Sequence, residues 1–382
     1  MKEILNILHT VEFYSPHVGG AELVVQQISE RLAARGHHLT VATTKLRERR
    51  SSMINGVKIE SFDVKGSLAH GFAGEDVRRY QQFLIHSKYD IIMNYAAQQW
   101  ATDLTFSVLN KIFHKPKVIA PCGYSALSDS KTIRWIKFAD YYNKIIPKVI
   151  PVYDAAVYHS GLYQDYKYAQ EHGFKNSVVI PNAVSEEEFK TAPDIRFRQK
   201  YSIDKRYIIL CVANFFPGKG QDRVIECFKS MSRSDAVLVL IGREGETLAQ
   251  LKEQAKGLNA VFLSGIPRED VVAAYFAADL FLFGSYIEAS PLVIIEAKAS
   301  RTPFVSVDCG NVKEWKGGVV CKPIEMDFHA NRILDSQSDH ERLAQDGYEE
   351  WKSKLTWSSV VDQYEDLYER VINERSKNSN IQ

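Results

Sequence analysis

Two glutamates stand eight positions apart in the apolar stretch GSYIEASPLVIIEAKAS, which covers residues 284–300. Ser290 is a good N-cap residue and Pro291 suits the first helical turn, so we predict a helix that begins at this step. Glu288 then lies in the loop before the helix, and Glu296 lies nearly two turns inside it. The two carboxylates are thus expected on either side of a helix start.

The predicted helix start between the glutamates can bind an anion. Backbone N–H groups near Leu292 and Val293 have no partner inside the helix, and the helix dipole is positive at this end, so a phosphate is favoured here. The flanking carboxylates repel a phosphate but accept hydrogen bonds from neutral hydroxyls. A sugar nucleotide offers a sugar, a diphosphate and a ribose in sequence. The alternative is that both glutamates are ordinary surface residues, because carboxylates are common near helix starts.

A second candidate binding segment is the loop NFFPGKGQDR, which follows the apolar strand candidate ILCVA. Lys219 stands between two glycines just before a predicted helix. Glycines allow a close backbone approach, and lysine supplies a point charge to a phosphate. The segment is not a P-loop, because it lacks the upstream glycine and the Ser or Thr after the lysine. A turn with a solvated lysine is the alternative.

The loop PHVGGAEL near the N-terminus carries Gly19 and Gly20 immediately before another predicted helix. This arrangement also lets an anion approach a helix start. It does not follow the G-x-G-x-x-G pattern, and no acidic residue ends the following strand candidate VATTK, so a nicotinamide cofactor is not expected. An ordinary tight turn is the competing interpretation.

Strands and helices that alternate along the chain are expected to position these loops. The apolar strand candidates are residues 4–8, 38–43, 89–94, 118–121, 155–159 and 178–180, and then 207–213, 236–241, 260–263, 280–283, 302–307 and 318–321. Helix candidates at 21–35 and 221–231 follow the first strand of each half. Such alternation predicts mostly parallel sheets with helices on both faces, which bind ligands at the carboxyl ends of the strands.

Length and composition limit the fold and its setting. A chain of 382 residues exceeds one compact core, so two domains are expected. No apolar run approaches a membrane span or a signal segment, and a cytoplasmic location is expected. Five scattered cysteines without a C-x-x-C pair favour reduced thiols over bridges or zinc. The first 184 residues hold 22 Lys or Arg against 16 Asp or Glu, an excess that suits a solvated surface, and no nucleic-acid partner is expected.

Taken in order along the chain, these motifs resemble those of the retaining glycosyltransferases of family 4, which have the GT-B fold. The likeness rests on the GG loop, VIPNAVSEEEF, CVANFFPGKG, LIGREGE, VFLSGIPREDVVAAYFAADLFLFGS and the E-x7-E pair. A final segment with Trp357, Tyr364 and Tyr368 is similar to the family's closing helix, which crosses back to the first domain.

The resemblance implies an α/β protein of two Rossmann-like βαβ domains that face a central cleft. Residues 1–184, together with a closing helix at 358–382, would bind the acceptor. Residues 185–357 would bind a nucleotide-sugar donor. The family transfers a hexose without a metal or a separate cofactor, and no D-x-D carboxylate pair of the metal-dependent kind is present here. A UDP-sugar such as UDP-glucose is the favoured donor, and the acceptor would be a glycan or a lipid-linked glycan in polysaccharide or cell-envelope biosynthesis.

The resemblance also assigns roles to residues. Lys219 would hold the diphosphate and Glu288 would position the donor sugar, and these two would carry catalysis by front-face departure of the diphosphate. Glu296 would accept from the ribose hydroxyls, and the base would lie near the loop 265–267. The other implied donor-binding residues are Gly19, Gly20, Asn214, Gly242, Arg243, Ile266, Ser290, Leu292 and Val293.

Two positions depart from the family pattern. The phosphate-binding arginine five residues before the lysine is Asn214 here, and Arg243 is the cation expected to compensate. The family has a histidine that touches the donor sugar, and its position corresponds here to Cys122 or one of its neighbours. Two other functions stay open: a nucleotide-sugar epimerase on the same architecture, and a non-catalytic nucleotide-sugar binding protein, which these two departures favour.

The segment KTIRWIKFADYYNKIIPKV, at residues 131–149, combines an apolar stripe with a basic side. A basic amphipathic helix can lie on an anionic membrane and approach a lipid-linked acceptor, which predicts a peripheral membrane contact. The alternative, a helix packed in the core with a solvated basic face, is the favoured one. The stripe consists of Trp135, Phe138, Tyr142, Ile145 and Val149, and the basic side of Arg134, Lys137, Lys144 and Lys148.

Overall fold

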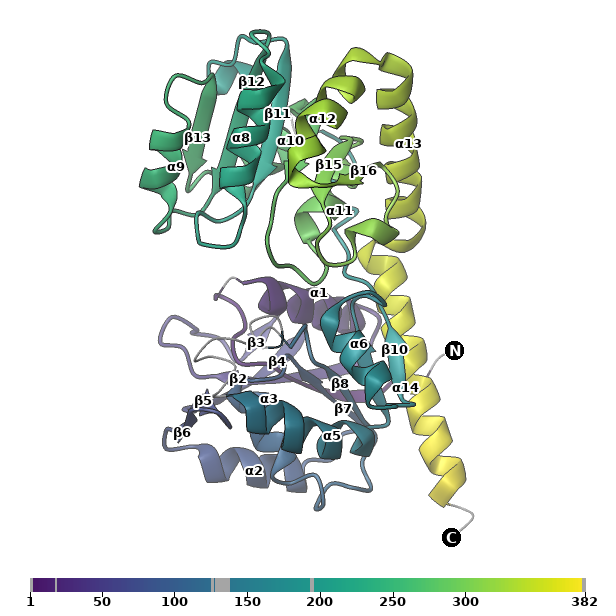
Figure 1. Cartoon of the computed structure of the whole chain (residues 1–382). Helices are drawn as coiled ribbons and strands as arrows, with labels where there is room; N and C mark the ends of the chain where they lie inside the picture. The colour runs from purple at the N-terminus through teal and green to yellow at the C-terminus, as the bar shows by residue number, and fades with distance from the viewer. Residues whose placement is uncertain (1–2, 18, 125–126, 128–137, 193–195, 380–382) are drawn as a thin grey trace. The chain divides into compact units, whose positions relative to one another are not determined.

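The computed structural model describes residues 3–17, 19–124, 127, 138–192 and 196–379 (Figure 1). The chain divides into two compact units. Unit 1 consists of residues 1–181 and 360–382, and unit 2 consists of residues 182–359. In each unit, helices cover both faces of a mostly parallel sheet, which confirms the predicted α/β class. The unit boundaries lie within three residues of the predicted domain boundaries.

Unit 1 is built around an eight-stranded sheet with the strand order β10-β9-β8-β7-β1-β2-β4-β3. Its strands are β1 (Asn6–Thr10), β2 (His38–Thr44), β3 (Met53–Ile54), β4 (Val57–Phe62), β7 (Ile91–Tyr95), β8 (Lys117–Ala120), β9 (Ala155–Tyr158) and β10 (Ser177–Val179), and a separate ribbon contains β5 (Lys65–Ser67) and β6 (Gly71–Ala73). Its helices are α1 (Gly20–Ala34), α2 (Val77–His86), α3 (Trp100–Phe106), η2 (Tyr141–Ile145), α5 (Ile146–Val149), η3 (Ile150–Val152), α6 (Gln164–Glu171) and most of α14 (Trp357–Ser379).

The central strand β1 shows why helices lie on both faces of this sheet. Because successive side chains of a strand point to opposite faces, Leu8 and His9 meet different layers. Leu8 belongs to a core cluster with side chains of α2 and α3. On the other face, the His9 ring bonds Ser29 of α1 through Nδ1 (2.8 Å) and Tyr368 of α14 through Nε2 (2.9 Å). Burial lowers the pKa of His9 to about 3, so a neutral imidazole links the two helices.

The last helix, α14, packs on unit 1 as the sequence predicts. Glu365 contacts two residues at the end of α1: Arg35 Nη1 lies 2.8 Å from its Oε2, and His37 Nε2 lies 2.9 Å from its Oε1. The helix also buries an apolar stripe of Val360, Tyr364, Leu367 and Val371. The expected return of the closing helix to the first domain is therefore confirmed.

A buried carboxylate in α3 makes the stability of unit 1 depend on pH. Asp103 is fully buried, and it accepts from Leu68 N (2.9 Å) and Tyr141 Oη (2.9 Å). Burial raises the pKa of Asp103 to about 6 from the model-compound value of 3.8. The folded state thus binds more protons than the unfolded state between these two values, so the contribution of Asp103 to stability is lost as the pH rises through about 6.

We therefore predict that the unfolding free energy of the wild type falls by about 2 kcal/mol relative to Asp103→Asn as the pH rises from 4 to 6.5, since each pKa unit corresponds to about 1.4 kcal/mol and part of the loss lies outside this range. Chemical denaturation of both proteins across this pH range measures the difference. The amide loses one acceptor at every pH, so only the slope with pH reports the carboxyl group. Parallel pH profiles would contradict the raised pKa.

Unit 2 contains a six-stranded parallel sheet with the order β13-β12-β11-β14-β15-β16. Its strands are β11 (Tyr207–Val212), β12 (Ala236–Gly242), β13 (Ala260–Ser264), β14 (Leu280–Phe283), β15 (Phe304–Val307) and β16 (Gly318–Cys321). Its helices are α7 (Phe197–Lys200), α8 (Gln221–Met231), α9 (Leu248–Gln254), α10 (Arg268–Ala277), α11 (Leu292–Ala299), η4 (Val312–Glu314), η5 (Pro323–Glu325), α12 (Met326–Asp335) and α13 (Gln337–Lys354).

The strand order of unit 2 reverses beside β11, which has β12 on one side and β14 on the other. The chain therefore leaves these neighbouring strands in opposite directions, toward α8 and toward α11. Such a switch point leaves a crevice at the carboxyl ends of the strands, where open α/β sheets bind ligands. Strands β11, β12 and β14 are almost entirely buried, and their apolar side chains form the core below this edge.

A buried ion pair connects helix α11 to helix α13. Lys298 Nζ donates to Glu350 Oε2 of α13, and the side chains are 0% and 12% exposed. The ammonium also lies 5.1 Å from the centre of the Trp315 ring. Burial lowers the pKa of Lys298 to about 8, with the Glu350 charge acting in the opposite direction. The pair fixes the position of the helix that carries Glu296.

The amphipathic segment 131–149 is partly visible. Trp135, Arg134 and Lys137 lie outside the described residues. Of the remaining stripe, Phe138 and Tyr142 are buried in the core of unit 1, and Ile145 and Val149 pack against it, while Lys144 and Lys148 are exposed. The described part thus favours the core-packed interpretation.

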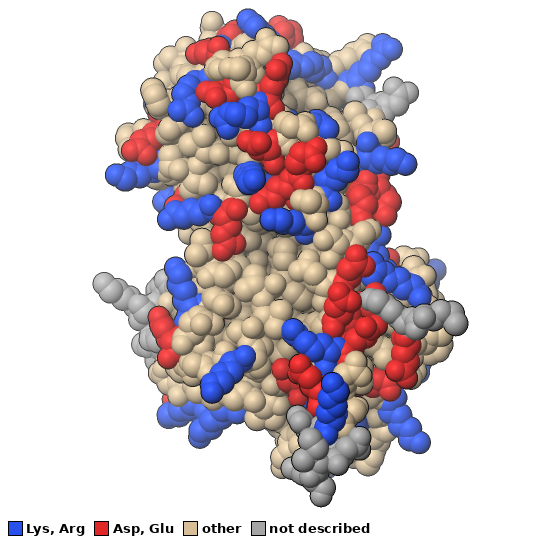
Figure 2. Space-filling view, turned by 90° about the vertical axis from the view of Figure 1, so that its right-hand side faces the viewer, with Lys and Arg blue, Asp and Glu red and all other residues tan. Residues whose placement is uncertain are grey.

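On the face drawn in Figure 2, acidic and basic side chains are interspersed, as is typical of a solvated surface.

Within the described ranges, no helix combines the length and the apolar character that are needed to cross a bilayer. All five cysteines are free thiols, as the sequence predicts.

Candidate active site

The loop between β11 and α8 is held against the end of β14 by two glycines. A Cβ on Gly220 would lie 2.0 Å from the carbonyl oxygen of Gly284, and a Cβ on Gly284 would lie 2.5 Å from that of Gly220. Gly220 also has a φ of +71°, which favours glycine. The Gly218 carbonyl oxygen accepts from Tyr286 N (2.9 Å). These contacts bring the loop with Lys219 beside the loop with Glu288.

The predicted pair of catalytic residues is in direct contact. Lys219 Nζ lies 2.6 Å from Glu288 Oε1, and the two side chains are 36% and 24% exposed. The ammonium that the sequence predicts for a phosphate and the carboxylate that it predicts for hydroxyls thus lie together at the switch point, although 69 residues separate them. The sequence predicts both residues at the site but not their contact.

The helix start between the glutamates lies one residue later than predicted. Helix α11 begins at Leu292 with Pro291 as the N-cap, so the prediction of Ser290 as the N-cap is wrong. Ser290 is instead held in the preceding loop, where its Oγ accepts from Asn311 Nδ2 (3.2 Å) and its carbonyl oxygen accepts from Asn182 Nδ2 (3.1 Å). Pro291, the N-cap of α11, makes no side-chain cap hydrogen bond, so the predicted binding of an anion by the backbone at Leu292 stays a prediction.

Glu296 lies inside α11, as predicted, and its carboxylate already has a protein partner. Arg268 Nη2 donates to Glu296 Oε1 (2.6 Å). The same guanidinium contacts Glu188, with Nε–Oε1 3.2 Å and Nη2–Oε2 3.0 Å. Desolvation lowers the pKa of Arg268, but the charges and hydrogen bonds of the two carboxylates together outweigh it and raise the pKa, so the arginine stays charged. The sequence does not predict this network.

The loops after β11 and β12 lie against each other at the same edge. Asn214 Oδ1 accepts from Arg243 N (3.1 Å), and a Cβ on Gly242 would lie 2.0 Å from the carbonyl oxygen of Ala213. The Arg243 side chain is exposed. Ile266 is partly buried in the next loop along the sheet, between β13 and α10. The structure thus gathers every predicted donor-binding residue of unit 2 along one sheet edge.

Gly19 and Gly20 belong to unit 1, at the start of α1. Gly19 is the N-cap in an extended conformation, and a Cβ on it would lie 2.3 Å from Glu22 Oε2. Gly20 has open space at the Cβ position. Gly19 therefore lies just before the helix as predicted, whereas Gly20 is the first residue of α1, and the role of both in binding stays a prediction.

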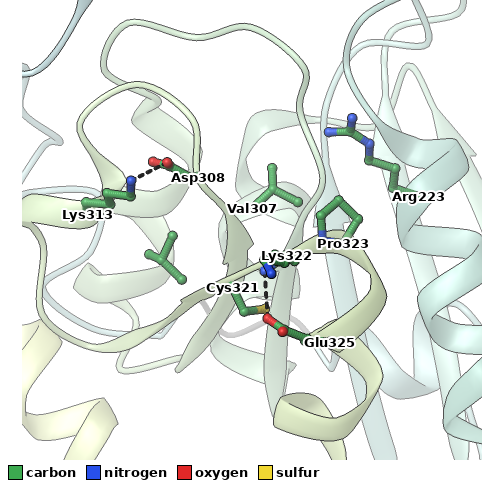
Figure 3. Close-up of a pocket in the computed structure, with 9 residues that line it drawn as sticks. Arg223, Val307, Asp308, Lys313, Cys321, Lys322, Pro323 and Glu325 are labelled. Carbon is green, nitrogen blue, oxygen red and sulfur yellow. Dashed lines mark hydrogen bonds and ion pairs between the residues drawn. The ribbon is translucent and has the colours of Figure 1, made fainter.

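A cavity of about 470 Å³ opens at the carboxyl ends of β15 and β16 (Figure 3). Asp308 and Lys313 form an ion pair in its lining, and the Glu325 carboxylate accepts from the Lys322 backbone N–H. Arg223 reaches the rim from α8. The lining includes none of the residues that the sequence predicts for the donor site.

Two functional features were missed by the sequence reasoning because they arise from tertiary contacts. Arg268 lies in the motif VFLSGIPREDVVAAYFAADLFLFGS, but the sequence assigns it no role, because its partners come from α11 and from the connection after β10. In that connection, SEEEF, Glu186 accepts from the backbone N–H groups of Trp357 (3.1 Å) and Ser358 (2.9 Å), while Glu188 binds Arg268. The run of three acidic residues was the available signal, because two of them meet donors that lie elsewhere in the chain.

Two family models match the chain in succession. Residues 18–188 match the model described as Glycosyltransferase Family 4, and residues 194–350 match the model described as Glycosyl transferases group 1. The first match falls on the described elements of unit 1, and the second contains the loops with Lys219 and Glu288.

Curated relatives and solved structures give the same picture. The GDP-mannose-dependent alpha-(1-6)-phosphatidylinositol monomannoside mannosyltransferase of Mycolicibacterium smegmatis is 29% identical over 43% of this chain and 48% of its own length, so the chain spans about half the length of this relative. Sucrose-phosphate synthase from Thermosynechococcus elongatus is similar in fold (TM-score 0.78, 17% identity, 96% of this chain and 99% of that chain). So is HepE of Anabaena in complex with UDP-glucose (TM-score 0.75, 17% identity, 96% and 100%).

Proposed function

Because the chain belongs to glycosyltransferase family 4 and has the GT-B fold, we propose that it transfers a hexose from a nucleotide sugar to a glycan or lipid-linked acceptor in polysaccharide or cell-envelope biosynthesis. The observation that carries the proposal is the contact between Lys219 and Glu288 at the switch point of unit 2. It places a cation for the diphosphate and a carboxylate for sugar hydroxyls beside the open start of α11.

The reaction we propose proceeds with retention of configuration. The bond between the anomeric carbon and the diphosphate oxygen breaks, and the diphosphate leaves with the bonding electrons. The acceptor hydroxyl attacks the same face of the sugar, and its proton passes to the departing phosphate oxygen. Lys219 and the N–H groups at the start of α11 stabilise the negative charge that develops on the leaving group. Glu288 orients the sugar through its hydroxyls.

The base of the donor is the point on which the relatives differ. The mycobacterial relative is named as GDP-mannose-dependent, whereas the Anabaena structure holds UDP-glucose. We propose a UDP-sugar such as UDP-glucose for this chain, with the base near Gly242 and Ile266 and the ribose at Glu296. The cytoplasmic location, and any peripheral membrane contact through residues 131–149, also stay proposals.

A donor panel without acceptor tests this function. We expect one of UDP-glucose, UDP-N-acetylglucosamine, GDP-mannose and ADP-glucose to raise the melting temperature, because a ligand that binds the native state stabilises it by mass action. The same donor should release its nucleoside diphosphate slowly by hydrolysis, and Lys219→Ala should abolish both effects. Isomerised donor would instead identify an epimerase, and binding without turnover would identify a binding protein. A panel in which no nucleotide sugar stabilises the protein would contradict the donor site itself.

A further inference from the structure

Arg268 links two carboxylates that come from distant parts of unit 2. It is the first residue of α10, and its Nη2 lies 2.6 Å from Glu296 Oε1 of α11. The other edge of the guanidinium faces Glu188, which follows β10 by nine residues. The group also lies over the ring of Phe189, 5.8 Å from its centre. An arginine with three such contacts has little freedom to move.

Glu296 needs the contact with Arg268 because its carboxylate is buried. Glu296 is 8% exposed, and a carboxylate so far from water requires a charged or hydrogen-bonding partner. The planar fork of Arg268 binds Glu188 through Nε and Nη2, and this fixed guanidinium also donates from Nη2 to Glu296, which a lysine could not do in the same geometry. Arg268 therefore restrains Oε1 of Glu296, and Glu188 together with Phe189 restrains Arg268.

We propose that Arg268 is a positioning residue for nucleotide recognition: by holding Oε1 of Glu296, it presents Oε2 as a fixed acceptor for one ribose hydroxyl. This inference rests on the proposed function, because it takes Glu296 as the ribose acceptor. A fixed acceptor discriminates more strongly than a mobile one, since its binding energy is not reduced by the entropy of ordering it. The site would thus select ribonucleotides over deoxyribonucleotides.

Arg268 has a second effect on the same ligand. Glu296 follows the start of α11 by four residues, which is about 6 Å along the helix axis. An unpaired negative charge at this distance from the phosphate-binding helix start would repel the diphosphate. The guanidinium offsets part of that charge, because it is shared between Glu296 and Glu188. Loss of Arg268 should therefore weaken binding of every nucleoside diphosphate, and additionally remove the preference for ribose.

The test is a set of dissociation constants measured calorimetrically on the full chain. UDP and GDP are each compared with their 2′-deoxy and 3′-deoxy forms. We expect the wild type to bind the better ribonucleotide at least about 10-fold more tightly than one of its deoxy forms, because a hydrogen bond to a charged group is strong. In Arg268→Ala this ratio should fall below about 3, and in Arg268→Lys it should lie between these values.

A matched control comes from the same acidic run. Glu187 is exposed and lies next to Glu188, so Glu187→Gln should keep the wild-type ratio. Glu188→Gln removes an anchor of the guanidinium and should reduce the ratio without abolishing it. Arg268→Met, which keeps the aliphatic stem over Phe189, replaces the alanine variant if that protein does not fold.

The outcomes separate the inference from the function on which it rests. If Arg268→Ala or Arg268→Met melts at a lower temperature but keeps the wild-type ratio, the arginine only ties α10 to α11, and the inference is overturned while the donor site stands. If the wild type binds UDP or GDP without preference over the deoxy forms, the inference is likewise overturned. If neither nucleotide nor any deoxy form binds to the wild type, the donor site and the inference fall together.

Discussion

Replacing Lys219 with alanine should lower kcat by at least about 100-fold, the size of effect seen when one preorganised donor to a developing charge is removed. The ammonium is the charge next to the open start of α11, and the proposed reaction places the departing diphosphate there. The fold should survive, because both members of the Lys219–Glu288 pair are partly exposed and pairs of this kind contribute at most about 1 kcal/mol. Steady-state kinetics and a melting curve on the same preparation measure both effects.

A matched lysine shows whether the effect belongs to the site. Lys313 also pairs with a carboxylate, Asp308, in a connection near the same sheet edge, and more than half of each side chain is exposed. Lys313→Ala should therefore keep kcat within about twofold of the wild type, since surface ion pairs contribute little. Similar losses in both variants would point to general damage of unit 2.

Replacing Glu288 should affect UDP binding in the opposite direction to replacing Lys219. In the ligand-free protein, its carboxylate holds the ammonium that the diphosphate is proposed to bind. UDP carries no sugar for Glu288 to orient, so Glu288→Gln should bind UDP more tightly than the wild type while transferring sugar more slowly. The role of Lys219 would be disproved by activity of Lys219→Ala within a few-fold of the wild type, and the role of Glu288 by full activity of Glu288→Gln.

How far the sequence predicts this protein depends on the range of the interactions involved. Helix α8 and strands β14 and β16 have the predicted bounds, because periodic apolar patterns and flanking glycines are local signals. The predicted start of α11 is one residue early, because the Ser290 hydroxyl accepts a hydrogen bond from Asn311 and does not cap the helix. A competing partner 21 residues away decides that cap, and the local pattern of Ser and Pro contains no sign of it.

The candidate site shows the same limit. Glu288, Glu296 and Lys219 were predicted as separate ligand-binding groups from their residue types and their neighbours. The contact of Lys219 with Glu288 depends on the close approach of Gly220 and Gly284, which lie in the segments after the adjacent strands β11 and β14 of a sheet whose order the sequence does not reveal. Residues whose roles depend on pairs of this kind, such as Arg268, need the structure to be recognised.

The largest effect on stability should come from the buried pair behind α11. Lys298→Met leaves Glu350 without its ammonium partner in a nearly closed environment, and removing one member of such a pair costs about 3 to 5 kcal/mol. Glu350→Gln should also lower the melting temperature, because it removes the carboxylate that keeps the fully buried Lys298 charged. Differential scanning calorimetry of the full chain should show a lower melting transition for each variant.

The double variant Lys298→Met with Glu350→Leu distinguishes a charge effect from a packing effect. Replacing both partners removes the desolvation of two ions, so the double variant should recover most of the lost stability, as buried pairs replaced by apolar side chains often do. Lys256→Ala, which breaks an exposed pair with Glu253, should leave the melting temperature nearly unchanged. Additive losses in the double variant would mean that Lys298 and Glu350 stabilise α11 independently, and the ion pair would then not be what holds the Glu296 helix in place.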